Sequence, residues 1–263
     1  MTQTNHWALI LGASSGFGEA TARALAQDGY NIFGVHLDRR SAQPHIDAIK
    51  ADVAAAGGHA VFFNVNAAAE EKRTKVLDQL SEHLGEGERV QVLLHSIAFG
   101  TLKPLVDDEP KQRIEKMAMD MTLDVMANSL VYWAQELIGR KLMVEGGRIF
   151  AMTSAGSRVI WRSYGAVSAA KSALESHCRQ LAVELGPHGI TANAILAGVT
   201  DTPALRKIPG HEAMMEQARA RHPRGRLTRP EDVAAAIALL CRPAAHWITG
   251  NTILVDGGET IAG

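Results

Sequence analysis

Cysteine is scarce in this sequence, which has only Cys178 and Cys241 among 263 residues. So small a number excludes a disulfide scaffold and a cysteine-rich zinc site, and we expect both thiols to be reduced core residues. No apolar run is long enough to span a membrane, and the first twelve residues lack the pattern of a signal peptide. The net charge of −1 predicts no attraction to nucleic acid or to an anionic membrane. These absences indicate an ordinary cytoplasmic globular protein without a metal site.

Short, mostly apolar runs of strand length alternate with helix-length segments along the chain. We predict strands at 7–11, 31–37, 60–65, 90–95, 147–153, 191–197 and 252–256. We predict helices at 17–28, 43–56, 69–83, 111–143 and 168–185, and a last helix opened by a capping box of Thr228 and Glu231. The alternation is typical of one α/β domain over 1–263, a doubly wound parallel sheet (Rossmann fold) with helices on both faces. The irregular, charged stretch at 198–227 is predicted to be a substrate lid.

Three glycines, Gly12, Gly16 and Gly18, lie directly between the first strand and the first helix. Glycine lets the backbone turn tightly and approach a pyrophosphate, whose charge then faces the helix N-terminus. At the first β–α junction of such a chain, this pattern predicts a bound dinucleotide.

The end of the second strand, "GVHLDRR", is the segment that distinguishes NAD from NADP. His36 occupies the position of the acidic residue that holds the ribose of NAD, and Arg39 and Arg40 follow. Arginine accommodates the 2′-phosphate of NADP, whereas Asp38 leaves NAD open. The segment therefore favours NADPH, with NADH as the alternative.

The glycine spacing G-x-x-x-G-x-G resembles that of the short-chain dehydrogenase/reductase superfamily, and the likeness covers essentially the whole chain. "NVN" (64–66) matches its adenine-side turn, "HSIAFG" (95–100) replaces its usual Asn-Asn-Ala-Gly, and "AGVTDT" (197–202) matches the segment that contacts nicotinamide and pyrophosphate. The resemblance implies cofactor contacts from Gly12, Ser14, Ser15, Gly16, Phe17, Gly18, His36, Arg39, Arg40, Asn64, Val65, Ser96, Ile97, Ala98, Lys171, Gly198, Val199, Thr200 and Thr202.

Departures from the superfamily pattern are more informative. Tyr164 precedes Lys171 by seven residues instead of four, and Met126 occupies the position of the asparagine that relays protons in ketone-reducing members. With "HSIAFG" and the lid segment, these features resemble the enoyl-acyl-carrier-protein reductases, and most of all their NADPH-dependent Bacillus-type branch (enoyl reductase III). Ser154 stands where common enoyl reductases have a second tyrosine, and it also matches the serine of ketone reducers.

The longer Tyr–Lys spacing suits enoyl reduction on physical grounds. On a helix, four residues advance about 400° and ~6 Å, and seven advance about 700° and ~10.5 Å, so both spacings share a face. In an unsaturated thioester the hydride goes to the β-carbon and the charge develops on the carbonyl oxygen, two bonds further away. Tyr164 would stabilise that enolate, and Lys171 would hold the ribose and favour the phenolate of Tyr164. We expect Tyr30 and Tyr132 to be core residues and His95 to be a packed strand-end residue.

Three functions remain open. The first is an enoyl-[acyl-carrier-protein] reductase that uses NAD(P)H in fatty-acid synthesis, with Tyr164, Lys171 and Ser154 as catalytic residues. The second is a ketone or 3-oxoacyl thioester reductase, which the spacing and Met126 disfavour. The third is a non-catalytic NADP-sensing module, which the presence of both Tyr164 and Lys171 disfavours. Acyl-chain length and the choice between acyl carrier protein and coenzyme A stay open.

Two expectations concern partners. The resemblance implies a homotetramer that pairs through the helices at 111–143 and 168–185. The lid has seven basic residues between 203 and 229 against Glu212 and Glu216, an excess that would attract an acidic acyl carrier protein. The seven are Arg206, Lys207, Arg219, Arg221, Arg224, Arg226 and Arg229.

Overall fold

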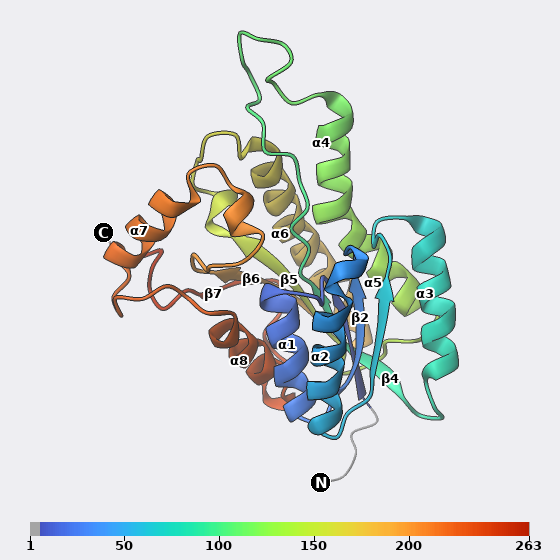
Figure 1. Ribbon diagram of the computed structural model, residues 1–263. Helices are drawn as coiled ribbons and strands as arrows, with labels where there is room; N and C mark the ends of the chain where they lie inside the picture. The colour runs from blue at the N-terminus through green and yellow to red at the C-terminus, as the bar shows by residue number, and fades with distance from the viewer. Residues whose placement is uncertain (1–5, 263) are drawn as a thin grey trace.

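A seven-stranded parallel sheet forms the centre of the protein in a computed structural model that describes residues 6–262 (Figure 1). The strand order is β3-β2-β1-β4-β5-β6-β7. The strands are β1 (His6–Leu11), β2 (Asn31–His36), β3 (Ala60–Asn64), β4 (Arg89–His95), β5 (Arg148–Ser154), β6 (Thr191–Ala197) and β7 (Thr252–Val255). The seven predicted strands are confirmed, and their predicted bounds differ from these by one residue at most.

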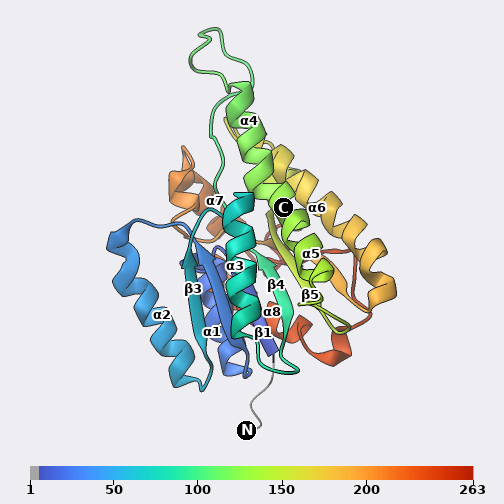
Figure 2. The same cartoon turned by 90° about the vertical axis from the view of Figure 1, so that its right-hand side faces the viewer.

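Helices cover both faces of the sheet (Figures 1 and 2). One layer packs around Phe150 and consists of α1 (Gly16–Gln27), α2 (Gln43–Ala55) and α8 (Pro230–Leu240). The other packs around Trp133 and consists of α3 (Glu70–His83), α5 (Ser129–Gly139) and α6 (Gly165–Leu185). The central strands are buried on both sides, as parallel sheets require. The predicted doubly wound α/β fold is therefore confirmed.

The helix predicted at 111–143 is shorter than expected and is not uniform. It consists of α4 (Lys116–Leu123), a π-helical segment at Asp124–Asn128, and α5. Residues 101–115 form the irregular loop that projects before α4 in Figure 1. The N–H of Ile114 donates to the carbonyl of Pro104 (2.9 Å), a loop contact that replaces a helical hydrogen bond.

The start of α8 also differs from the prediction. The capping box of Thr228 and Glu231 is wrong, because Pro230 takes the first helical position and Arg229 becomes the N-cap. Asp232 closes the cap instead, accepting a hydrogen bond from the Arg229 backbone N–H at 2.8 Å. The hydroxyl of Thr228 is buried without a hydrogen-bond partner among the described residues.

The carboxyl ends of the strands meet at the edge of the sheet where α4 and α7 (His211–Arg221) project in Figure 1. Successive strands are added outward on one side from β1 to β3 and on the other side from β4 to β7. The strand order therefore switches between the parallel neighbours β1 and β4, and this edge is the switch point at which such sheets bind ligands. The predicted lid begins there, after β6, and contains a 3-10 turn at Leu205–Lys207 followed by α7.

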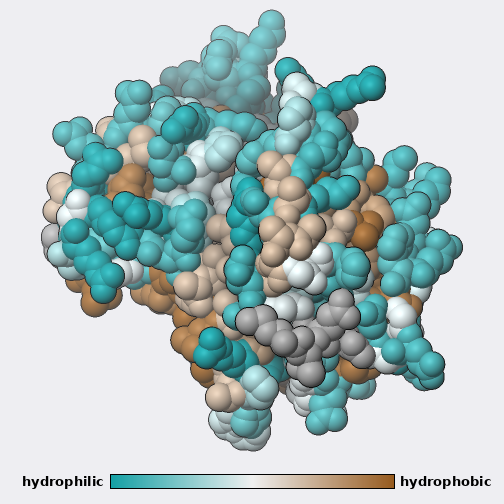
Figure 3. Space-filling view, turned by 60° about the horizontal axis from the view of Figure 1, so that its bottom comes forward, coloured by the Kyte–Doolittle hydropathy of each residue, from teal (hydrophilic) through white to brown (hydrophobic). Residues whose placement is uncertain are grey.

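The surface carries both hydrophilic and apolar residues. On the face shown in Figure 3, hydrophilic residues surround separate apolar patches. Among residues 6–262, no helix is long and apolar enough to cross a membrane.

Candidate functional site

The turn between β1 and α1 is built so that only glycine fits it. Gly12 and Gly16 have φ values of +90° and +56°. A Cβ on Gly12 would lie 2.2 Å from the carbonyl oxygen of Ser96, and one on Gly18 would lie 2.0 Å from that of Gly12. Ser15 is the N-cap of α1, and its hydroxyl makes no capping bond to the first turn. The helix N-terminus is therefore open to an anion, and the turn fits the diphosphate of a dinucleotide.

The segment after β6 lies against this turn. A Cβ on Gly16 would be in contact with Cγ2 of Thr202 at 3.4 Å. Thr200 and Thr202 are buried, and the hydroxyl of Thr200 donates to the carbonyl of Gly198 (2.9 Å). The structure thus brings together two predicted cofactor segments that are far apart in the sequence.

A small network fixes the end of β2. Nδ1 of His36 lies 2.9 Å from Oδ2 of Asp38, so the carboxylate turns toward the buried imidazole. The N–H of Asp38 donates to Oδ1 of Asn64 (3.1 Å), and the N–H of Val65 donates to the carbonyl of His36 (2.8 Å). Arg39 and Arg40 are exposed beside this network and form no ion pair with the described residues.

Lys171 is buried at the ends of β4 and β5. Its Nζ donates to the carbonyl oxygen of Met152 at 2.7 Å and to that of Ile97 at 3.4 Å. Burial lowers the pKa of Lys171 to about 8, and the nearby carboxylate of Glu175 opposes that shift. Among residues 6–262 these two oxygens are the acceptors of the ammonium, so one of its three protons is available to a ligand hydroxyl.

Tyr164 lies beside Ser154, with the phenol oxygen 3.4 Å from the serine Oγ. A Cβ on Gly156 would lie 2.3 Å from Cε1 of Tyr164, so the ring packs directly on the glycine backbone. The preceding residue, Ser163, has a φ of +63°, a strained value for a residue with a side chain. The three predicted catalytic residues therefore lie on β5, on the loop that follows it, and on α6.

Two details of the expected tyrosine geometry are corrected. The helix was expected from 168, but α6 begins at Gly165 and Tyr164 is its N-cap, with a φ of −96° and a ψ of 2°. The carbonyl of Tyr164 accepts the N–H of Ser168 (2.8 Å), so the tyrosine lies where the loop joins the first turn of the helix. The expected phenolate is also wrong for the protein alone, because burial raises the pKa of Tyr164 and only the Ser154 hydrogen bond opposes this.

The other expectations for single residues are mostly confirmed. Tyr30, Cys178 and Cys241 are buried, and burial raises the pKa of each thiol to about 12. His95 is fully buried, with Nε2 2.8 Å from the Ser129 hydroxyl, and burial lowers its pKa to about 3. Tyr132 is not a core residue, since it is partly exposed and lies under the guanidinium of Arg73.

Two buried carboxylates support the site and were not predicted. Glu175 accepts a hydrogen bond from the Thr153 hydroxyl (2.7 Å), and Glu259 accepts one from the N–H of Val199 (2.9 Å). Glu259 also lies 3.7 Å from the Arg221 guanidinium, so it joins the start of the segment after β6 to the end of α7. The residues of each contact are far apart in the sequence, so no local sequence pattern predicts it.

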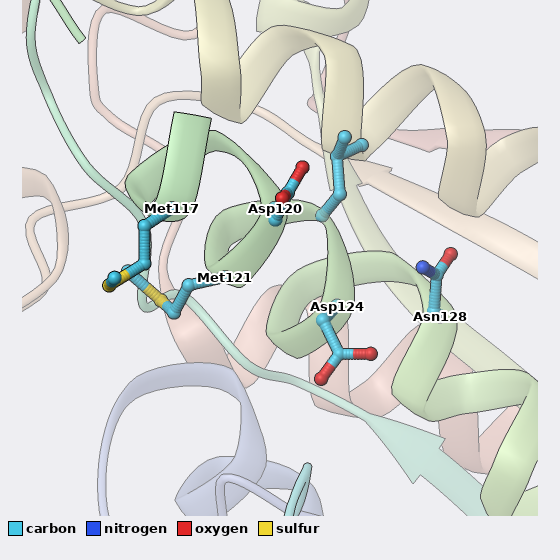
Figure 4. Close-up of a pocket in the computed structure, with 6 residues that line it drawn as sticks. Met117, Asp120, Met121, Asp124 and Asn128 are labelled. Atoms are coloured by element: carbon cyan, nitrogen blue, oxygen red, sulfur yellow. The ribbon is translucent and has the colours of Figure 1, made fainter. Parts of the chain in front are cut away.

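An open groove of about 580 Å³ lies elsewhere, along α4 and the π-helical segment (Figure 4). Met117 and Met121 line one part of it, and Asp124 and Asn128 lie further along the same run. None of its lining residues was predicted to bind cofactor or substrate. Among residues 6–262, no cluster of His, Cys, Asp or Glu side chains could hold a metal ion.

Comparison with known proteins agrees with this geometry. Residues 12–260 match the family described as "Enoyl-(Acyl carrier protein) reductase". A 1-cyclohexenylcarbonyl-CoA reductase of Streptomyces collinus is 31% identical over 255 residues, which cover 96% of this chain and 86% of that protein. A versicolorin reductase of Emericella nidulans is 30% identical over 263 residues, covering 95% of this chain and 94% of that one.

Two solved structures share the fold over nearly the whole chain. The NADH-dependent enoyl-[acyl-carrier-protein] reductase of Aquifex aeolicus superposes with a TM-score of 0.85 at 25% identity, covering 99% of this chain and 98% of that one. A short-chain dehydrogenase of Burkholderia cenocepacia, solved in complex with NADP, gives a TM-score of 0.84 at 28% identity, covering 99% and 100%. The similar proteins are reductases and dehydrogenases, so this chain is an oxidoreductase that uses a nicotinamide cofactor.

The glycine turn provides a direct test of cofactor binding. We predict that Gly18→Ala weakens the affinity for both NADPH and NADH at least tenfold, about 1.4 kcal/mol, because the new methyl group displaces the Gly12 backbone. Fluorescence titration measures this. Gly139→Ala is the matched control, since a Cβ at that position in α5 would meet nothing within 4 Å. Unchanged affinity in the Gly18 variant would show that the turn does not hold the diphosphate.

Proposed function

The chain belongs to the short-chain dehydrogenase/reductase superfamily and to its enoyl-(acyl carrier protein) reductase family, and from that premise we propose that it reduces the trans-2 double bond of enoyl thioesters in fatty-acid synthesis. The observation that carries the proposal is the pair formed by Tyr164, at the end of the β5–α6 loop, and Lys171, buried one and a half helical turns into α6. A second supporting observation is that Met126 is buried and that its thioether cannot relay a proton.

The bound nicotinamide would supply the hydride that reaches the β-carbon of the substrate. The thioester carbonyl oxygen then carries the developing charge, and protonation of the α-carbon completes the reduction. The raised pKa of Tyr164 keeps its phenol protonated at neutral pH, so it can donate a hydrogen bond to that oxygen. The bond strengthens as the charge develops, which accelerates the step. Lys171 would hold the ribose with the proton that the two strand-end carbonyls leave free.

Apolar side chains around Tyr164 support an acyl substrate. Leu105 packs where a Cβ on Gly165 would lie, at the first residue of α6. The loop before α4 also exposes Phe99 and Val106, and the loop before Tyr164 exposes Val159 and Ile160, which is 95% exposed. Two loops on either side of Tyr164 in the sequence thus carry exposed apolar side chains, which an acyl chain could cover. The name of the Streptomyces relative also describes a thioester whose carbonyl is attached to a carbon–carbon double bond.

A ketone or 3-oxoacyl thioester reductase is the second candidate. The 3.4 Å approach of Ser154 to Tyr164 favours it, because a hydroxyl beside the phenol could also bind a ketone oxygen. Turnover of a crotonyl thioester against an acetoacetyl thioester separates the two functions. Cofactor binding with turnover of neither would identify a non-catalytic NADP-sensing module.

We predict that Tyr164→Phe lowers kcat for the crotonyl thioester about 10²–10³-fold, the loss expected for one oxyanion donor. Cofactor affinity should change little, because the ring and its packing on Gly156 remain. Steady-state kinetics with cofactor titration measures both quantities.

Ser154→Ala is the matched control, since it removes the neighbouring hydroxyl and leaves the phenol. Full activity in the Tyr164 variant together with loss of activity in the Ser154 variant would assign the enolate to the serine. That outcome would overturn the proposed role of Tyr164.

We propose that NADPH is the preferred cofactor and that Arg39 and Arg40 bind its 2′-phosphate. Both guanidinium groups are exposed and unpaired among the described residues, while Asp38 is turned toward His36. Replacing both arginines with glutamine should raise KM for NADPH at least tenfold and leave KM for NADH nearly unchanged. Equal effects on the two values would contradict the assignment.

We propose that the substrate arrives on an acidic acyl carrier protein, with coenzyme A thioesters as the alternative. The lid is less basic than its sequence suggests, because Arg206 and Arg226 pair with Asp201 and Asp232, and Arg221 lies near Glu259. Lys207, Arg219, Arg224 and Arg229 stay exposed without an ion pair among the described residues. These four are the cations that can steer a partner.

Charge reversal of Lys207 and Arg219 should raise KM for carrier-bound substrate several-fold at low salt, with little change for the coenzyme A thioester. Kinetics at two ionic strengths measures the difference. Equal changes for both substrates would sink the carrier-protein proposal.

For the assembly we propose a cytoplasmic homotetramer that pairs through α4–α5 and α6. The groove in Figure 4, with Met117 82% exposed, lies on that helical face. Light scattering at micromolar protein gives the mass that decides this point.

A further inference from the structure

Glu175 is a buried carboxylate on α6, one helical turn after Lys171. It is 6% exposed, and its Oε1 accepts the hydroxyl of Thr153 at 2.7 Å. Its Oε2 lies 3.8 Å from the guanidinium of Arg158, which is largely in solvent. Burying a carboxylate costs free energy unless a charge or several hydrogen bonds compensate it. One neutral hydroxyl and one distant, exposed cation compensate Glu175 poorly.

Lys171 is a buried cation that lacks a negatively charged hydrogen-bond partner among the described residues. Its ammonium is buried, and its recorded acceptors are two neutral carbonyl oxygens, those of Met152 and Ile97. Residues at i and i+4 lie on one face of a helix, so the side chains of Glu175 and Lys171 leave α6 on the same side. The two form no direct ion pair within 4.0 Å, but the charge of the carboxylate acts on the ammonium and raises the pKa of Lys171. Thr153 is the strand neighbour of Met152, so the nearer acceptor of the lysine and the donor to the glutamate come from one end of β5.

Apart from Arg158, the other titratable groups named around this pair are neutral. His95, from β4, is fully buried with its pKa lowered to about 3, and Tyr164 keeps its phenolic proton because burial raises its pKa. The thiol of Cys178, on the next turn of α6, stays protonated because its pKa is raised to about 12. Arg158 approaches from the loop after β5 and contacts Glu175 rather than Lys171. Glu175 is therefore the charge that can balance the ammonium.

We propose that Glu175 is a positioning residue that keeps Lys171 charged and directed to the ends of β4 and β5, where the cofactor ribose is expected. The proposal uses the cofactor-binding role of Lys171 from the proposed function and does not depend on the thioester substrate. Without the carboxylate, the buried lysine would lose its proton more readily, and the neutral amine would hold the ribose hydroxyls less well.

The test is the pH dependence of NADPH affinity, measured by fluorescence titration from pH 6 to 10 without substrate. In the unmodified protein the affinity should be constant at low pH and fall above about pH 8, where Lys171 loses its proton. In Glu175→Gln this fall should begin about one pH unit lower. Glutamine keeps an oxygen that can accept the Thr153 hydroxyl, so the change removes charge and little else.

Two variants separate charge from packing. Thr153→Val removes the hydroxyl that Glu175 accepts and should leave the pH of the fall unchanged. Glu175→Asp keeps the charge and should restore most of the shift. A fall at the same pH in Glu175→Gln as in the unmodified protein would overturn the proposal, as would an equal shift in Thr153→Val.

A second measurement uses the unmodified protein and covers the case in which Glu175→Gln does not fold. The ¹⁵N resonance of the Lys171 ammonium, assigned with Lys171→Met, should show an inflection at acid pH that coincides with the carboxyl ¹³C titration of Glu175. A lysine resonance that does not respond to that titration would also overturn the proposal. Both measurements stay informative if the protein reduces ketones instead of enoyl thioesters.

Discussion

The buried ammonium of Lys171 is the contact on which the arrangement of the site depends. It joins α6 to the carbonyl ends of β4 and β5, two neighbouring strands of the sheet. A cation in this position is costly because burial removes it from water. The protein offsets that cost with strand-end carbonyls and with a carboxylate on the same helix, and the rest of the site is arranged around this fixed point.

The glycine turn imposes a second constraint, because its backbone positions have no room for a Cβ atom. Without a side chain at Gly12, the turn approaches the end of β4 closely enough for the Ser96 carbonyl to fill the space of a Cβ. Without one at Gly18, the first turn of α1 packs directly on the backbone of Gly12. This close approach leaves the N-terminus of α1 open on the same edge as Lys171. The diphosphate and ribose ends of a dinucleotide would therefore meet groups from β1, β4 and α6 that the sheet holds in register.

Local sequence patterns predicted the strands, the glycine turn and the burial of His95, because each depends on residues within one element. They did not predict contacts between elements. Thr153 and Glu175 are 22 residues apart, and Val199 and Glu259 are 60 apart, so neither pair forms a motif. The excess of basic residues counted over 203–229 was also too high. The carboxylates that pair with Arg206 and Arg226 lie just outside that range. The cap of α8 moved by one residue because Pro230 determined where the helix could begin.

The spacing of Tyr164 and Lys171 acquires a different physical meaning in the structure. The helix alone does not place the phenol, because Tyr164 is the N-cap of α6 and its ring rests on Gly156, outside the helix. The strained backbone of Ser163 and the end of β5 orient the phenol, whereas α6 orients the lysine. Three extra residues therefore separate two independently held groups, one on a loop and one on a helix. Such a separation allows the phenol to reach an oxygen two bonds beyond the carbon that accepts hydride, while Lys171 stays at the strand ends. A phenol held by the loop can also be repositioned by changes at Gly156 or Ser154 without moving the lysine. This independence explains how a serine suited to ketones and a tyrosine spacing suited to enoyl thioesters can coexist in one site.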